Sequence, residues 1–142
     1  MKSKAALVAR ILLGLLFFVF GLNGFLGFLE QPEGTPEGEA FLTSLMDTGY
    51  LMTMIKVIET TCGALLLAGY FVPLALVLLA PIIVNILGFH VFLDPSVQGL
   101  GMAIVILVLH LVVTSQHWSA YESVLVAKAG RSSAATSGDV QD

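Results

Sequence analysis

The chain has 142 residues, of which 57% are hydrophobic and only 11% are charged, and its mean hydropathy is +0.95. Because soluble domains carry about 25% charged residues, this composition indicates a single-domain membrane protein. The net charge is only −4 and no cluster of lysine and arginine occurs, so we expect no nucleic-acid partner, and the single cysteine cannot form a disulfide within the chain.

The first predicted element is a membrane-spanning helix at about residues 5–29. The start MKSKAALVAR is basic, as in a signal peptide, but the apolar run that follows exceeds the roughly 7–15 residues of a signal-peptide core, and no A-x-A cleavage site follows it. We therefore expect a retained helix. Gly14 and Gly21 fall on one face that permits close helix packing, whereas Asn23 points to nearly the opposite side. The glycine face is thus a predicted second contact surface, for instance for a partner chain.

The acidic segment that follows predicts a short amphipathic helix. Thr35 and Pro36 are typical of a helix start. Four apolar residues then share one face, which favours a helix lying on the membrane surface: Phe41, Leu42, Leu45 and Met46. A plain surface loop is the alternative.

Three further spans are predicted at about residues 51–70, 72–92 and 97–115, because a spanning helix needs roughly 20 mostly apolar residues. Pro73 suits the first turn of the third span, and Asp94 is a predicted N-cap of the fourth. Pro81 lies in the middle of the third span, where it should kink the helix and free the carbonyl of Val77. The predicted fold class is therefore all-α, a four-transmembrane-helix bundle with one short surface helix.

The cations predict how the chain is oriented. Five of the six lysines and arginines lie near the two ends of the sequence: Lys2, Lys4, Arg10, Lys128 and Arg131. The acidic loop at residues 30–49 contains none, so the positive-inside rule places this loop outside and both termini in the cytoplasm. The membrane domain is expected at residues 5–118, and a cytoplasmic tail at 119–142 is expected to be largely disordered beyond about residue 128.

The stretch MTMIKVIETTCG places Lys56 and Glu59 inside the second span. A charge at the centre of a spanning helix costs about 2.5–3.5 kcal/mol on insertion scales, so this helix is expected to depend on its neighbours. The spacing i, i+3 lets the two side chains meet on one helix face. A structural clamp between helices and a functional site both fit this pair.

Polar residues from three spans are predicted to lie at one depth. Counted at about 1.5 Å per residue, most of them lie about 9–13 Å from the outer edge, with the histidine nearer the rim. These residues form a candidate polar pocket of the outer leaflet: Asn23, Lys56, Glu59, Asn85 and His90. His110 lies deeper, at about 18 Å, and is either a relay residue or a histidine that bonds within the bundle.

No sequence motif of soluble-type catalysis or zinc binding occurs, so no catalytic residue and no metal ligand is assigned. His117 and Trp118 follow the last span and are typical of an interfacial anchor.

Three segments resemble the DoxX family of small bacterial membrane proteins. They are the segment from Arg10 to Gly24, which contains FGLNG, the K-x-x-E of Lys56 and Glu59, and the P-x3-N-x4-H-x3-D-P from Pro81 to Pro95. The resemblance implies a four-helix protein of the bacterial inner membrane. It also implies association with quinone-linked or thiol-related membrane oxidoreductases, so quinone is a candidate cofactor and none is assigned.

Three functions fit these observations. In the first, the chain is a subunit or partner of a membrane redox system with a pocket of the size of a quinone or lipid headgroup. Lys56 donates to a carbonyl of the headgroup, Glu59 accepts or donates the proton, and the other pocket residues orient them. In the second, the chain is a non-enzymatic scaffold that docks an oxidoreductase subunit or a second copy of itself. In the third, it is a pathway for a small solute or protons. Catalysis by this chain alone is not expected.

Overall fold

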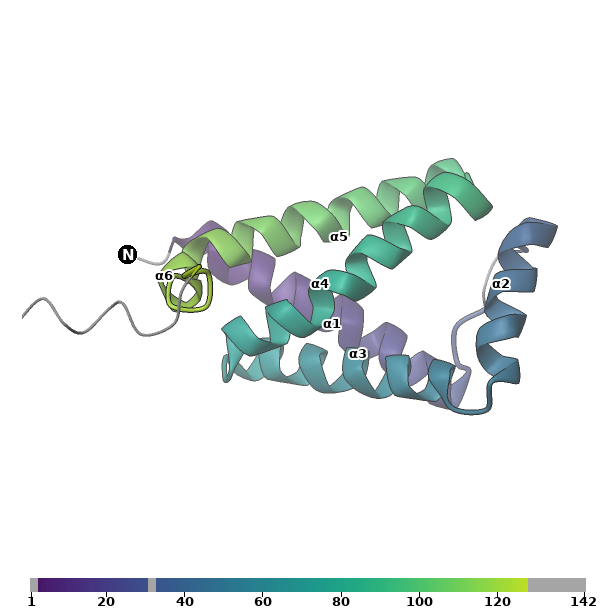
Figure 1. Cartoon of the computed structure of the whole chain (residues 1–142), viewed down its shortest axis with the longest axis horizontal. Helices are drawn as coiled ribbons and strands as arrows, with labels where there is room; N and C mark the ends of the chain where they lie inside the picture. The colour runs from purple at the N-terminus through teal and green to yellow at the C-terminus, as the bar shows by residue number, and fades with distance from the viewer. Residues whose placement is uncertain (1–2, 31–32, 128–142) are drawn as a thin grey trace, which may run out of the picture.

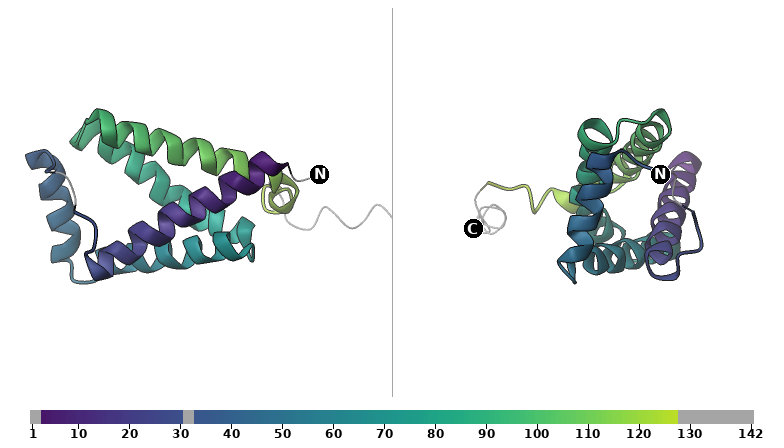
Figure 2. Two further views of the ribbon diagram at one scale, coloured as in Figure 1. Left: turned by 180° about the vertical axis from the view of Figure 1, so that it is seen from behind. Right: turned by 90° about the vertical axis from the view of Figure 1, so that its right-hand side faces the viewer.

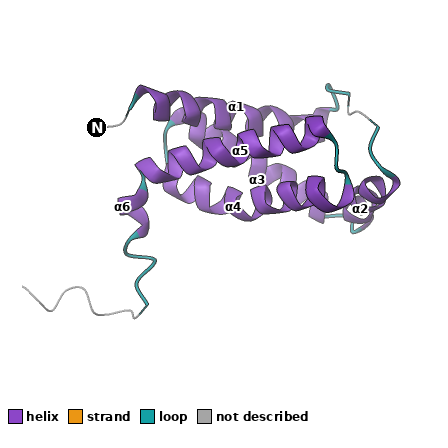
Figure 3. Cartoon of the chain, turned by 90° about the horizontal axis from the view of Figure 1, so that it is seen from above, coloured by secondary structure: helices purple, strands orange, loops and turns teal. Residues whose placement is uncertain are grey.

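The computed structural model describes residues 3–30 and 33–127, and all regular structure in these ranges is helical (Figure 3). The long helices are α1 (Lys4–Leu26), α3 (Leu51–Ala68), α4 (Val72–Gly88) and α5 (Val97–Gln116). The short ones are α2 (Pro36–Asp47), the π-helix η1 (Phe89–Leu93) and α6 (Trp118–Tyr121). Four segments are long and apolar enough to cross a membrane, the third being α4 together with η1. The predicted all-α fold class is confirmed.

The four long helices form a closed ring in which each contacts two others, in the order α1, α3, α4, α5 (Figure 2). The contact between α1 and α3 is the most extensive. Helix α2 lies across one end of the ring, which we call the α2 end (Figure 1). The start of α1, the end of α5 and α6 lie at the opposite end, which we call the terminal end.

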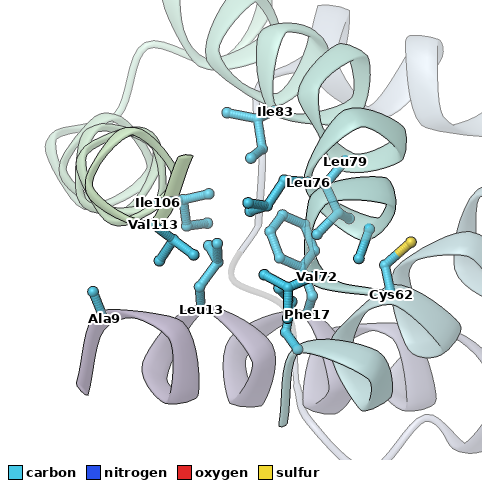
Figure 4. Close-up of a cluster of buried hydrophobic side chains, with 12 residues drawn as sticks. Ala9, Leu13, Phe17, Cys62, Val72, Leu76, Leu79, Ile83, Ile106 and Val113 are labelled. Carbon is cyan, nitrogen blue, oxygen red and sulfur yellow. The ribbon is translucent and has the colours of Figure 1, made fainter. Parts of the chain in front are cut away.

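Apolar side chains from all four long helices fill the centre of the ring (Figure 4). Leu13 of α1, Leu66 of α3 and Leu79 of α4 are completely buried there. Large apolar residues also cover the outside of the long helices, for example Val8, Leu74 and Leu111. The long helices are therefore apolar both on the faces that point into the ring and on the faces that point outward. This is expected of a helix bundle surrounded by lipid.

The first span ends three residues earlier than predicted. Gly27 follows α1 with a left-handed φ of 62°, and its N–H donates to the carbonyl of Asn23 at 2.8 Å. The side-chain oxygen of Asn23 accepts a second bond from the N–H of Leu29 at 2.7 Å. The apolar sequence continues to Leu29, but this capping turns the chain away after Leu26.

The third and fourth spans differ from the prediction at their junction. Pro73 lies in the first turn of α4, as predicted, and α4 continues through Pro81 to Gly88. The predicted N-cap Asp94 is wrong: the N-cap of α5 is Ser96, whose hydroxyl accepts the N–H of Gly99 at 3.0 Å. Helix α5 begins only after Pro95, so Asp94 stands too far upstream to reach its first free N–H groups.

Helix α2 is the predicted amphipathic helix, and it is tied to the bundle. The hydroxyl of Thr35 accepts the N–H of Gly38 at 3.1 Å and donates to the carbonyl of Leu93 at the end of η1. The ring of Phe41 packs against that of Phe89, with centroids 5.8 Å apart. The apolar face of α2 is therefore used in part by η1.

At the terminal end, α6 is tied to α4. The hydroxyl of Tyr121 donates to the carbonyl of Pro73 at 2.8 Å. The predicted disorder of the tail beyond residue 128 falls outside the described residues.

Candidate functional site

The close contact of α1 with α3 positions the charged pair. A Cβ added to Gly14 would lie 2.9 Å from the Cβ of Leu66, and one added to Gly63 would collide with the backbone of Phe18. Gly21 likewise lies directly against Thr60. The glycine face of α1 is thus buried against α3, so the prediction that it serves as a further contact surface for a partner chain is wrong. Small residues let membrane helices approach closely, and here they do so within one chain.

Lys56 and Glu59 form an ion pair on α3, with Lys56 Nζ 3.0 Å from Glu59 Oε2. The side chain of Glu59 is only 7% exposed, whereas that of Lys56 is 24% exposed. The aliphatic stem of Lys56 lies over Gly24 of α1, where a Cβ would leave it no space. The carbonyl of Lys56 accepts the hydroxyl of Thr60 at 2.8 Å, which fixes the backbone below the pair.

The pair lies at the α2 end of the bundle. Lys56 is five residues and Glu59 eight residues from the start of α3, which corresponds to about 8 and 12 Å along the helix. An ammonium has three N–H donors and a carboxylate has two acceptor oxygens. The ion pair uses one donor and one oxygen, and no described residue donates to Glu59 Oε1. The pair can therefore present a donor and an acceptor side by side to a small polar group.

Asn23 is buried, as predicted, and it acts as a cap. Its side-chain oxygen accepts the N–H of Leu29, and its carbonyl accepts the N–H of Gly27. No hydrogen bond among the described residues joins Asn23 to Lys56 or Glu59. Asn23 fixes the end of α1 directly beside Gly24, on which the stem of Lys56 rests. Its role in holding a ligand stays a prediction.

Asn85 and His90 also bond locally. Asn85 is exposed on α4 and donates its amide to the carbonyl of Pro81 at 2.9 Å. His90 lies in η1, with Nδ1 3.4 Å from the carbonyl of Asp94, and its ring packs directly against Gly99 at the start of α5. Both residues lie toward the α2 end, but the structure gives each of them partners other than the ion pair. The five-residue pocket stays a prediction, with Lys56 and Glu59 as its centre.

His110 joins two helices. Its Nε2 lies 2.8 Å from the carbonyl of Leu76 in α4, and its Nδ1 lies 3.4 Å from the hydroxyl of Thr114. Because a carbonyl only accepts, Nε2 carries the hydrogen. The prediction was that Pro81 leaves the carbonyl of Val77 without its helical hydrogen bond. His110 instead bonds the carbonyl of the preceding residue, Leu76. His110 is thus placed as a bridge within the bundle, and its role as a relay stays a prediction.

Two polar residues outside the predicted pocket also take defined places. Arg10 lies against Gly69 at the end of α3, and Tyr121 binds the carbonyl of Pro73. In the sequence, Arg10 was assigned only to the cations that set the orientation and to the first segment that resembles the DoxX family. A single arginine at the edge of an apolar run does not indicate which other helix its side chain will contact.

The comparisons agree with this architecture. The family model described as DoxX matches residues 5–91, more than half of the chain. The matched part includes α1 except its first residue, the ion pair of α3, all of α4 and His90. Neither a curated protein nor a solved structure matches the chain.

Proposed function

This chain belongs to the DoxX family, and we propose that it is an accessory membrane subunit of a redox system that engages a quinone or quinol headgroup at Lys56 and Glu59. The proposal takes its redox setting from the family resemblance and its site from the ion pair. In the same proposal the protein resides in a bacterial inner membrane, with both termini cytoplasmic and residues 30–49 outside.

One observation carries the site assignment: a nearly buried carboxylate is paired with a partly exposed ammonium close to one end of the bundle. A quinone carbonyl accepts hydrogen bonds, and a quinol hydroxyl both donates and accepts. Lys56 can donate to the first, and Glu59 Oε1 can accept from the second. The pair thus matches both redox forms of one headgroup.

The surroundings of the pair favour such a ligand over a freely soluble one. Apolar side chains are exposed on the same α2 end, among them Met54 and Val57 on α3 and Phe25 on α1. A ligand with an apolar tail can approach along these side chains while its polar head meets Lys56. A quinone that diffuses within the bilayer has this form.

Quinone binding can be tested by titrating a short-chain quinone analogue into the protein in lipid nanodiscs. We expect Lys56→Met to weaken binding of the oxidised analogue and Glu59→Gln to weaken binding of its reduced quinol form, each by about tenfold. The first substitution removes the donor to a carbonyl, and the second removes the charged acceptor of a hydroxyl. Glu122→Gln is the matched control, because Glu122 is an exposed carboxylate at the terminal end. If the variant that carries both substitutions binds like the wild type, the pair is not the site.

A scaffold role is the second candidate, and a specific observation favours it. Asn23, Asn85 and His110 all bond to main-chain groups inside the chain. If the ion pair likewise only stabilises contacts within the chain, the polar residues hold the helices together and bind no ligand. Purification in mild detergent separates the two proposals. The scaffold role is supported if the variant that carries both Lys56→Met and Glu59→Gln still co-purifies with a stoichiometric oxidoreductase subunit or remains a homo-oligomer.

A further inference from the structure

A cavity of about 270 Å³ opens at the terminal end, far from the ion pair. It lies between the first turns of α1 and the last turn of α5, which lie side by side (Figure 2). Its volume falls just below the roughly 300 Å³ at the lower end of small-molecule sites, so it suits a headgroup better than a large ligand.

The lining of the cavity is mostly apolar and includes two cationic residues. Lys4 and Arg10 contribute two positive charges, and no described lining residue is acidic. Leu7 and Val113 contribute apolar surface. A ligand that carries a negative charge next to methylene groups matches both kinds of lining residue.

Arg10 offers an unused hydrogen-bond donor. Its Nε is fully buried and has no hydrogen-bond partner among the described residues. The rest of the guanidinium lies against Gly69, where an added Cβ would be 2.6 Å from Nη1. The arginine is held in place by the end of α3, and a guanidinium stays charged at all ordinary pH values. No described residue accepts a hydrogen bond from this guanidinium, so an anion beside its remaining N–H groups is favoured.

Gln116 and His117 also line the cavity. The Nδ1 of His117 lies 3.0 Å from the carbonyl of Val113, so Nδ1 carries a hydrogen and Nε2 is left for a second partner. Trp118, the only tryptophan of the sequence, follows directly and is 53% exposed. Tryptophan at the end of a span is typical of the headgroup level of a membrane.

We propose that this cavity binds the phosphate of an anionic phospholipid, with the phosphate at Arg10 and Lys4 and the first methylenes of the acyl chains against Leu7 and Val113. Basic pockets between membrane helices bind acidic headgroups in this manner. The largely apolar lining favours the lipid over free phosphate, which has no apolar group to place against it.

Trp118 supplies the probe. The full chain is placed in nanodiscs that contain a fixed fraction of anionic phosphatidylglycerol in phosphatidylcholine, and bromine, which quenches tryptophan, is carried on the acyl chains of one lipid or the other. The membrane charge stays constant while the label moves. We expect stronger quenching when the anionic lipid is brominated.

Variants test whether the anionic lipid is enriched near Trp118 because it binds in the cavity. Arg10→Gln and Lys4→Gln should each lower the apparent affinity for the anionic lipid about fivefold, which corresponds to about 1 kcal/mol for each cation near the surface. Arg131→Gln is the control, since it removes one positive charge from the tail sequence and should leave quenching unchanged. A thermal unfolding curve for each variant identifies any loss of fold, and Lys4→Gln keeps the test valid if Arg10→Gln does not fold.

Three results would overturn the proposal. The first is equal quenching by the two brominated lipids in the wild type. The second is an enrichment that survives in both the Arg10 and the Lys4 variants. The third is its loss on addition of millimolar inorganic phosphate at constant ionic strength, which would assign the cavity to a soluble anion.

Discussion

His110 of α5 donates its Nε2–H to the main-chain carbonyl of Leu76 in α4 across 2.8 Å. The histidine is buried, and the contact joins two helices that are otherwise held by apolar packing. Such a bond uses a polar side chain to fix the register of α5 against α4.

The first prediction concerns this bond. We expect His110→Leu to lower the free energy of unfolding by about 1 kcal/mol, within the range measured for hydrogen bonds between membrane helices. Thr114→Val is the control, because it removes only the weak 3.4 Å contact to Nδ1 and should have a smaller effect. Denaturation in mild detergent measures both. Equal stabilities of His110→Leu and the wild type would contradict the bridging role.

The second prediction concerns the contact of α1 with α3. We expect Gly63→Ala to destabilise the protein by about 1–3 kcal/mol, because the new methyl group meets the backbone of Phe18, which cannot move aside by itself. Gly101→Ala introduces the same methyl group on α5, where nothing lies within 4 Å. The control should be neutral or stabilising by up to about 1 kcal/mol. A neutral Gly63→Ala would show that the helices are not packed this closely.

The third prediction concerns the attachment of α2. Thr35→Val removes the hydroxyl that bonds both to Gly38 and to the carbonyl of Leu93. We expect amide hydrogen exchange in α2 to become at least about fivefold faster, as for the loss of roughly 1 kcal/mol of local stability. Ser44→Ala removes an exposed hydroxyl that bonds only within α2, and it should change exchange much less. Unchanged exchange in Thr35→Val would contradict the attachment.

The fourth prediction concerns pH. Burial raises the pKa of the Tyr121 hydroxyl, which donates to the carbonyl of Pro73. The folded state therefore holds this proton more tightly than the unfolded state. The contribution to stability is complete below the ordinary tyrosine value of about 10 and is lost as the pH rises through the folded value. The stability difference between the wild type and Tyr121→Phe, measured by unfolding from pH 8 upward, should thus shrink above about pH 10. A difference that grows there would contradict the assignment.

The sequence predicted the helices well and their contacts poorly. Long apolar runs define spans because the bilayer sets their length. Pro73 marks a helix start by its fixed φ and missing N–H, and Thr35 marks one by its capping hydroxyl. The end of α1 was missed because Gly27 and the cap from Asn23 interrupt a run that stays apolar to Leu29. Hydropathy alone contains no information about such a turn.

The candidate site was predictable only in part. The spacing of Lys56 and Glu59 predicts their ion pair, since both lie on one helix. Depth counting places Asn23 and Asn85 at a similar level, but it does not say which way they point around their helices. The structure gives Asn85 an exposed position and bonds Asn23 to its own turn. The helix that packs on the glycine face of α1 could not be predicted either, because the sequence of one helix face does not show whether its neighbour belongs to the same chain.

The most direct test of the central claim is a structure of the wild-type protein determined in lipid with a bound quinone analogue. We predict headgroup density within hydrogen-bond distance of Lys56 Nζ and, for the quinol form of the analogue, a hydroxyl directed toward Glu59 Oε1. An occupied analogue elsewhere in the bundle, with Lys56 bonded only to Glu59 and lipid chains over the pair, would contradict the claim and leave the pair as a structural clamp.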